Sequence, residues 1–233
     1  MSEDWHAIAR DLGERGYVAR KVDLHRFLDC CPMSLREFGA ALNQEVRRVD
    51  SHPILMGYSM GGRLALHALL EDPLLWKGAV IVSAHTGLKQ EQTAERAKRV
   101  VQDTEWAGRA LLDEWEDFLL AWNRQGVLQG GGELQWPSRL GLKSRRRQIA
   151  RSFMDWSLGQ QDDLSQAIKD LETPLMWVNG QGDSKFLEVA SRLKELRPQL
   201  HHQVISSASH RVPWENQKEF VNQVSLWLQE RVI

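Results

Sequence analysis

The stretch Pro53-Ile-Leu-Met-Gly-Tyr-Ser-Met-Gly-Gly62 joins a short apolar run directly to the pattern Gly-x-Ser-x-Gly. The run 54–56 predicts a buried strand, and the apolar spacing of residues 64–69 predicts a helix behind it. Gly57 and Gly61 allow a tight turn in which a Cβ would clash, and the turn exposes the hydroxyl of Ser59 at the sheet edge. The pattern alone is common by chance, but its place between a strand and a helix predicts a nucleophile elbow.

The helix expected after Ser59 has a further chemical consequence. Its first turn presents unbonded backbone N–H groups and the positive end of the helix dipole to the serine. The N–H group of Met60, the residue after the serine, is therefore expected to stabilise a developing oxyanion.

The composition is that of an ordinary globular protein. The 233 residues are 42% apolar and 26% charged, which fits one large domain or a core with an inserted subdomain. The 30 basic and 31 acidic residues nearly cancel, so charge gives no support for binding nucleic acid or a membrane surface. The adjacent Cys30 and Cys31 make a structural disulfide between them geometrically implausible, which fits a reducing compartment.

No apolar stretch reaches the roughly 18 residues needed to span a bilayer. The first residues also lack the basic and apolar regions of a signal peptide. We therefore expect a cytoplasmic protein with no membrane insertion.

Short β-branched runs alternate with helical patterns along much of the chain, which favours an α/β fold with a mostly parallel sheet flanked by helices. About five strands are expected. The predicted strands are 18–24, 54–57, 79–83, 175–179 and 203–206, and the predicted helices lie near 3–15, 34–48, 61–71, 185–196 and 215–231.

The alternation stops after Leu88 and resumes only near residue 174. We predict a helical cap, 89–171, inserted after the third strand into a core formed by 1–88 and 172–233. Glycines at 130–132 and Pro137 predict a loop in its middle. The cap carries five of the ten tryptophans, most of them expected to pack cap helices against the core, with one or two lining a pocket: Trp106, Trp115, Trp122, Trp136 and Trp156.

A serine nucleophile needs a base, and that base needs a group that holds its tautomer. Asp183 follows the strand 175–179, and His210 follows the strand 203–206. The order Ser, Asp, His at the ends of successive strands predicts a catalytic triad of Ser59, Asp183 and His210. The alternatives are a turn aspartate and a surface loop histidine. No cluster of histidines and carboxylates has metal-ligand spacing, so neither a metal nor a cofactor is predicted.

With this triad and helical insert, the chain resembles the α/β-hydrolases. Its motifs resemble in particular the 2-succinyl-6-hydroxy-2,4-cyclohexadiene-1-carboxylate synthases of menaquinone biosynthesis. The matching motifs are GYSMGGR (57–63), SAHTGL (83–88), ERAKRVVQDTEWA (95–107), GQGDSKF (180–186) and SASH (207–210).

The resemblance implies a lyase that eliminates pyruvate from a succinyl-cyclohexene polycarboxylate, a small-molecule substrate. Ser59, activated by His210 and Asp183, would remove a substrate proton. Arg63 and Arg99 would bind substrate carboxylates, because a planar guanidinium binds a carboxylate bidentately. The alternatives are a surface salt bridge for Arg63 and a solvated helix face for Arg99.

Two aromatic side chains join the substrate site by the same resemblance. These are Tyr58 in the elbow motif and Trp122 in the cap, where Asn123 replaces the tyrosine that the family has beside this tryptophan. A third arginine of the family is not assigned among Arg145, Arg146, Arg147 and Arg151, and the run 145–147 alternatively forms a solvated helix face.

The chain departs from the family at its beginning. The family begins with strands and a His-Gly-Phe loop that supplies a second oxyanion donor. This chain shows neither feature, and its residues 2–12 look like the helix that follows that loop. The competing explanations are a start assigned too late, which we favour, and a shortened, inactive homologue. Two other functions remain open: an ester or thioester hydrolase with an acyl-enzyme at Ser59, and a non-catalytic binding protein.

Overall fold

A computed structural model of the chain describes residues 3–128 and 139–232. The loop predicted from glycines 130–132 and Pro137, and the tryptophan Trp136, lie outside the described residues.

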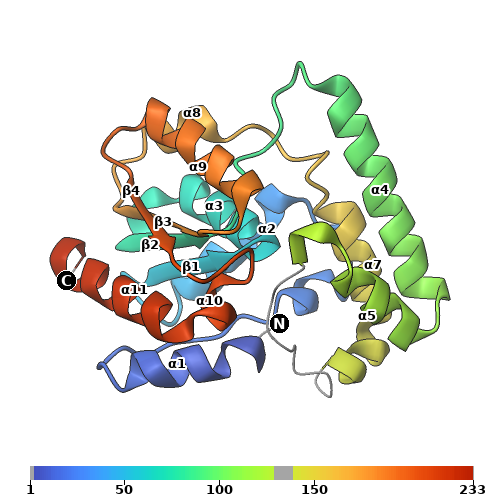
Figure 1. Ribbon diagram of the computed structural model, residues 1–233, viewed down its shortest axis with the longest axis horizontal. Helices are drawn as coiled ribbons and strands as arrows, with labels where there is room; N and C mark the ends of the chain where they lie inside the picture. The colour runs from blue at the N-terminus through green and yellow to red at the C-terminus, as the bar shows by residue number, and fades with distance from the viewer. Residues whose placement is uncertain (1–2, 129–138, 233) are drawn as a thin grey trace. The chain divides into compact units, whose positions relative to one another are not determined.

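Four strands form one parallel sheet in the described part of the chain. They are β1 (Ile54–Tyr58), β2 (Gly78–Val82), β3 (Leu175–Gly180) and β4 (His201–Ile205), and they lie side by side in that order (Figure 1). All three pairings are parallel. Every residue of β2 and β3 is buried, as expected for the central strands of a sheet that is covered on both faces. The predicted α/β fold with its parallel sheet is confirmed.

The strand predicted at 18–24 is not present. Residues 17–23 form no regular element, and a 3₁₀ helix, η2 (Leu24–Leu28), follows them. Val18 is 91% exposed, so its β-branched side chain has no pleated neighbour to pack against. Because β-branched residues favour a strand mainly through such packing, composition alone misled this prediction. The sheet therefore has four strands where about five were expected, and the long helical insertion follows β2, the second strand.

The chain divides into two compact units. One contains Met1–Ser34 and Leu88–Asp162, and the other contains Leu35–Gly87 and Asp163–Ile233. The expected division differs at two places, because it assigned residues 1–34 to the sheet core and residues 163–171 to the cap.

The second unit holds the sheet and the helices that follow its strands. α2 packs against α3, and α3 packs on β1 and β2 (Figure 1). α9 contacts β3, and α11 contacts β4. The helices are α2 (Leu35–Val46), α3 (Met60–Glu71), η3 (Pro73–Leu75), α8 (Ser165–Lys169), α9 (Ser184–Leu196), α10 (Val212–Glu215) and α11 (Gln217–Arg231).

The first unit is helical in its described residues. Its long helix α4 (Thr93–Leu112) packs along α7 (Arg146–Asp155). The other helices are η1 (Glu3–Trp5), α1 (His6–Gly13), η2, α5 (Trp115–Asn123), η4 (Gly126–Leu128) and η5 (Gly141–Arg145).

Three tryptophans in the described part of this unit pack among its own helices: Trp106, Trp115 and Trp122. Trp115 belongs to a buried cluster with residues of α4, α5 and α7. The rings of Trp106 and Trp122 meet edge to face at 5.0 Å, and Trp122 meets Phe153 at the same distance. Trp156 is fully buried. Trp106, Trp115 and Trp122 therefore pack inside the unit that carries them. No helix of residues 3–128 and 139–232 has the length and apolar character to cross a membrane.

Candidate active site

The turn between β1 and α3 has the strained backbone of an elbow. Ser59 has φ 51° and ψ −116°, a conformation that non-glycine residues rarely adopt. Its N–H donates to the carbonyl of Val82 at 2.8 Å, and its own carbonyl accepts from the N–H of Arg63 at 3.0 Å. The strain is thus held by the neighbouring strand and by the first turn of α3, and the predicted turn is present.

Two glycines make room for this turn. A Cβ on Gly57 would lie 2.4 Å from the carbonyl oxygen of Gly61, and a Cβ on Gly62 would lie 2.7 Å from the Cβ of Ala84. α3 can therefore begin directly against β1 and the end of β2. Sequence reasoning recognised Gly57 but not Gly62, because this requirement comes from a different strand.

Ser59, Asp183 and His210 come together at the carboxyl ends of three parallel strands. Nε2 of His210 lies 3.1 Å from Oγ of Ser59, and Nδ1 of His210 lies 2.9 Å from Oδ2 of Asp183. The side chains of His210 and Asp183 are 3% and 4% exposed. A hydroxyl, an imidazole and a carboxylate in this order have the spacing that proton transfer requires.

Aromatic rings fix the plane of the imidazole. The ring of Phe186, from the first turn of α9, lies 4.5 Å from that of His210, and the ring of Tyr58 lies 5.3 Å from it. Tyr58 is in turn packed edge to face on Trp214 at 4.9 Å. The predicted substrate residue Tyr58 therefore stands directly beside the histidine, and Phe186 and Trp214 are neighbours that sequence reasoning did not identify.

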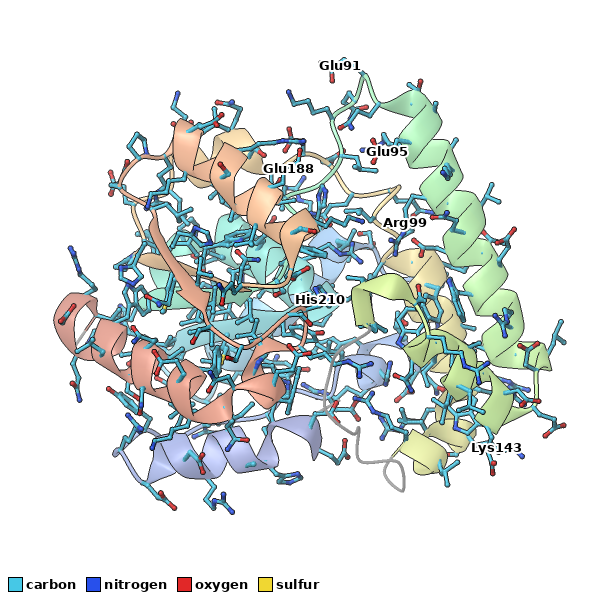
Figure 2. The ribbon with its side chains drawn as sticks, viewed as in Figure 1. Glu91, Glu95, Arg99, Lys143, Glu188 and His210 are labelled. Atoms are coloured by element: carbon cyan, nitrogen blue, oxygen red, sulfur yellow. The ribbon has the colours of Figure 1, made fainter. Side chains whose placement is uncertain are left out.

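Backbone and side-chain contacts hold the loop that carries His210 after β4 (Figure 2). The N–H of Gly182 donates to the carbonyl of Ala208 at 2.9 Å, and a Cβ on Gly180 would lie only 2.1 Å from the carbonyl of Ser209. The carboxylate of Glu215 accepts from both the N–H and the hydroxyl of Ser209. Sequence reasoning missed Glu215, whose role depends on the path of this loop.

Met60 and Arg63 lie on the first turn of α3, as the elbow predicts. Because Met60 is the first residue of the helix, its N–H has no carbonyl of a preceding helical turn to bond. Arg63 is 7% exposed, which does not fit the alternative of a surface salt bridge. The neighbouring motif at 83–88 has structural contacts: Nδ1 of His85 accepts from the N–H of Gly87 at 3.0 Å.

Arg99 and Trp122 belong to the helical unit. Arg99 forms a two-pronged ion pair with Asp103 one turn further along α4, with Nε–Oδ2 and Nη2–Oδ1 distances of 2.8 Å each. Its side chain is 35% exposed, whereas that of Asp103 is 3% exposed. The Arg99 guanidinium is therefore anchored on one edge, and it does not lie loose on a solvated helix face.

Of the four arginines among which the third substrate arginine was left unassigned, three are engaged within the helical unit. Arg145 pairs with Asp23, Arg146 donates to the carbonyls of Ala110 and Asp113, and Arg151 donates to the carbonyls of Leu28 and Cys31 and to Asp155. Within the described residues, no group of three or more His, Cys, Asp or Glu side chains has the arrangement of a metal site.

Comparison with known proteins identifies the family. A profile described as the alpha/beta hydrolase family matches residues 2–224. The chain belongs to the alpha/beta hydrolase family. Among curated relatives of this α/β-hydrolase, the 2-succinyl-6-hydroxy-2,4-cyclohexadiene-1-carboxylate synthase of Enterobacter sp. (strain 638) is 34% identical over 221 residues. That match covers 92% of this chain and 82% of the relative.

A putative synthase of the same name from Haemophilus influenzae is 27% identical over 232 residues, covering 95% of this chain and 90% of the relative. The solved structure of MenH from S. aureus superposes on this α/β-hydrolase with a TM-score of 0.81 at 21% identity, covering 98% of this chain and 89% of MenH. A thermophilic esterase from Thermogutta terrifontis superposes with a TM-score of 0.66 at 16% identity, covering 93% of this chain and 76% of the esterase. The resemblance to the synthases is confirmed by the sequence matches, and the solved structures confirm the fold.

Proposed function

We propose that this α/β-hydrolase is a lyase that eliminates pyruvate from a succinyl-cyclohexene polycarboxylate to give 2-succinyl-6-hydroxy-2,4-cyclohexadiene-1-carboxylate in menaquinone biosynthesis. The observation that carries the proposal is the position of His210 between Ser59 and Asp183. The sequence similarity to synthases of that name supports this choice of reaction.

The proton chemistry follows from the two hydrogen bonds of His210. The ionised carboxylate of Asp183 can only accept, so Nδ1 of His210 carries the proton and Nε2 presents a lone pair to the hydroxyl of Ser59. Ser59 transfers its proton to Nε2 as its oxygen takes a proton from a substrate carbon. The electron pair of that C–H bond enters the ring, and the C–O bond to the pyruvate-yielding group breaks. The imidazolium, stabilised by Asp183, returns a proton to the departing group.

The substrate carries several carboxylates, and the proposal gives each anionic centre a donor. Arg63 and Arg99 bind carboxylates through their planar guanidinium groups. The N–H of Met60 stabilises the oxyanion that develops as the proton leaves. Tyr58 and Trp122 contact the apolar part of the substrate. No acyl intermediate on Ser59 is needed.

The alternative function is an ester or thioester hydrolase. The same triad favours it, because a serine whose proton is accepted by a histidine can attack a carbonyl carbon and form an acyl-enzyme. The likeness of the fold to that of an esterase from Thermogutta terrifontis is consistent with this chemistry.

One pair of assays separates the two functions. Pyruvate release from the succinyl-cyclohexene precursor is followed with a lactate dehydrogenase couple, and a p-nitrophenyl ester is followed by stopped flow. The lyase releases pyruvate in multiple turnovers and gives no stoichiometric nitrophenol burst. A burst without pyruvate release supports the hydrolase. In the lyase, Arg99→Ala reduces pyruvate release far more than it reduces any ester hydrolysis.

A further inference from the structure

The ion pair between Arg99 and Asp103 occupies one defined edge of the guanidinium. Asp103 accepts from Nε and from Nη2, which together form the side edge of the group. The end edge is formed by Nη1 and the second hydrogen of Nη2, and within residues 3–128 and 139–232 it makes no hydrogen bond or ion pair. Since the Arg99 side chain is 35% exposed, a second carboxylate can reach that edge.

Asp103 is itself fixed by a third donor. The hydroxyl of Ser157 donates to Oδ2 of Asp103 at 2.7 Å, and Ser157 Oγ accepts from the N–H of Gly159 at 3.1 Å. Both Asp103 and Ser157 are 2% exposed. The carboxylate of Asp103 thus accepts from Nε and Nη2 of Arg99 and from the hydroxyl of Ser157. These donors fix its orientation, and the fixed carboxylate in turn orients the guanidinium of Arg99.

The segment that supplies Ser157 lies directly on the first half of α4. A Cβ on Gly159 would lie 2.5 Å from the carbonyl of Arg96 and 3.0 Å from the backbone nitrogen of Val100. Nη1 of Arg96 donates at 2.7 Å to the carbonyl of Gln161, two residues further along the same segment. Arg99 projects from α4 on the side where α7 ends and this segment begins (Figure 2). The segment that carries Ser157 is therefore packed closely against α4.

We propose that Asp103 and Ser157 are positioning residues that hold the side edge of Arg99, so that its end edge is presented to one carboxylate of the substrate. This inference rests on the proposed function, in which Arg99 binds substrate. A free arginine side chain samples many rotamers, and the ion pair removes much of that freedom before the substrate arrives. The arrangement favours a planar carboxylate over other anions, because the end edge offers two parallel N–H groups.

The test compares kcat and KM for pyruvate release in four variants: Arg99→Ala, Asp103→Asn, Ser157→Ala and Asp113→Asn. Asp113 is the matched control, since this residue directly after α4 pairs with Arg109 at the same i,i+4 spacing, with an Nε–Oδ2 distance of 2.8 Å. We expect Asp103→Asn to raise KM about tenfold or more, because the amide no longer orients Arg99, with kcat changed less than about threefold. Ser157→Ala raises KM by a smaller factor, and Asp113→Asn leaves it within about twofold.

A double variant decides whether Asp103 acts through Arg99. Asp103→Asn added to Arg99→Ala is expected to raise KM no further than Arg99→Ala alone, because the group that it orients is gone. A further rise of the same factor as in the single variant overturns the inference, as does an unchanged KM in both Asp103→Asn and Ser157→Ala. Circular dichroism and thermal unfolding are recorded for each variant. If Asp103→Asn does not fold, the KM of Ser157→Ala, which removes both hydrogen bonds of the Ser157 hydroxyl, decides whether this support orients Arg99.

The outcomes also separate this inference from the function on which it rests. If Arg99→Ala raises KM strongly while Asp103→Asn and Ser157→Ala do not, the lyase proposal stands and the positioning role is overturned. If the wild-type protein releases no pyruvate, or Arg99→Ala leaves KM unchanged, the role of Arg99 fails and the positioning role fails with it.

Discussion

Both oxygens of the Glu215 carboxylate accept hydrogen bonds from a single residue, Ser209, which directly precedes His210. One donor is the backbone N–H of Ser209 and the other is its hydroxyl, at 3.1 Å. Glu215 ends the short helix α10, so it ties the histidine loop to the segment that follows the loop.

From this contact we predict that Glu215→Ala lowers kcat for pyruvate release by about 10- to 100-fold. Loss of the carboxylate leaves the Ser209 N–H without its acceptor and lets Nε2 of His210 drift from Ser59, and a small misplacement of a catalytic group is costly. The control is Glu188→Ala, because Glu188 forms an exposed ion pair with Arg192 on α9. A wild-type kcat in Glu215→Ala would contradict the positioning role of Glu215.

A second prediction concerns the steric requirement at the elbow. Gly57→Ala places a Cβ within 2.4 Å of the Gly61 carbonyl oxygen and 2.8 Å of the Ala65 Cβ, so it should lower the free energy of unfolding by about 2–3 kcal/mol. In α4, a Cβ on Gly108 has no atom within 4 Å, so Gly108→Ala should raise the free energy of unfolding by up to about 1 kcal/mol. Urea unfolding measures both changes. Equal stability of the two variants would refute this interpretation of the turn.

A third prediction concerns acid stability. Burial lowers the pKa of His25 to about 4, with Arg145 and Arg139 adding to the effect and Asp23 opposing it. The folded state therefore keeps His25 neutral while the unfolded state takes up a proton below a pH of about 6.5. The stabilisation is complete above about pH 6.5 and falls by up to about 3 kcal/mol as the pH drops to about 4.

His25→Gln removes this contribution to the pH dependence. Urea unfolding of wild type and His25→Gln between about pH 7.5 and 4.5 should show a shallower loss of stability in the variant. Parallel curves for the two proteins would show that His25 is not the group that titrates.

A fourth prediction concerns a buried amide in the sheet unit. Nδ2 of Asn43 donates to the carbonyl of Ala68 at 2.8 Å, and Oδ1 of Asn43 accepts from Nε1 of Trp76 at 3.1 Å. Asn43→Ala leaves the indole N–H without its acceptor and should cost about 2 kcal/mol of unfolding free energy. Gln44→Ala, at an exposed position of the same helix, should change it by less than about 0.5 kcal/mol. Similar changes in unfolding free energy for both variants would mean that the hydrogen bonds of Asn43 do not stabilise the fold.

Three strands, β1 to β3, were predictable as short apolar runs between turn signals, whereas β4 has the sequence HHQVI and only its end is apolar. The runs at 54–57, 79–83, 175–179 and 203–206 match β1 to β4 within about two residues. In a parallel sheet the carboxyl ends of all strands lie at one edge. This rule, together with the order Ser, Asp, His along the chain, predicted that Ser59, Asp183 and His210 would meet. The separations of 3.1 and 2.9 Å agree with that prediction.

Contacts made by loops were not predictable from the same patterns. The run at 18–24 has the composition of a strand, but a strand also needs a paired neighbour, which composition does not reveal. The clamp of Glu215 on Ser209 depends on a loop in which Ser207 adopts a φ of 52°. Asp103 lies four residues after Arg99 on the same helix, so this ion pair could have been predicted from the spacing. Ser157 lies 54 residues after Asp103, so its hydrogen bond to Asp103 could not.

The central claim is that the hydroxyl of Ser59, activated by His210 and Asp183, removes the substrate proton in a lyase reaction. The most direct measurement is kcat/KM for pyruvate release by wild-type protein and by Ser59→Ala, with circular dichroism to show that both are folded. The account predicts a loss of about 10³-fold or more in the variant, because the base is gone. Pyruvate release by Ser59→Ala within a few-fold of the wild-type rate would contradict it.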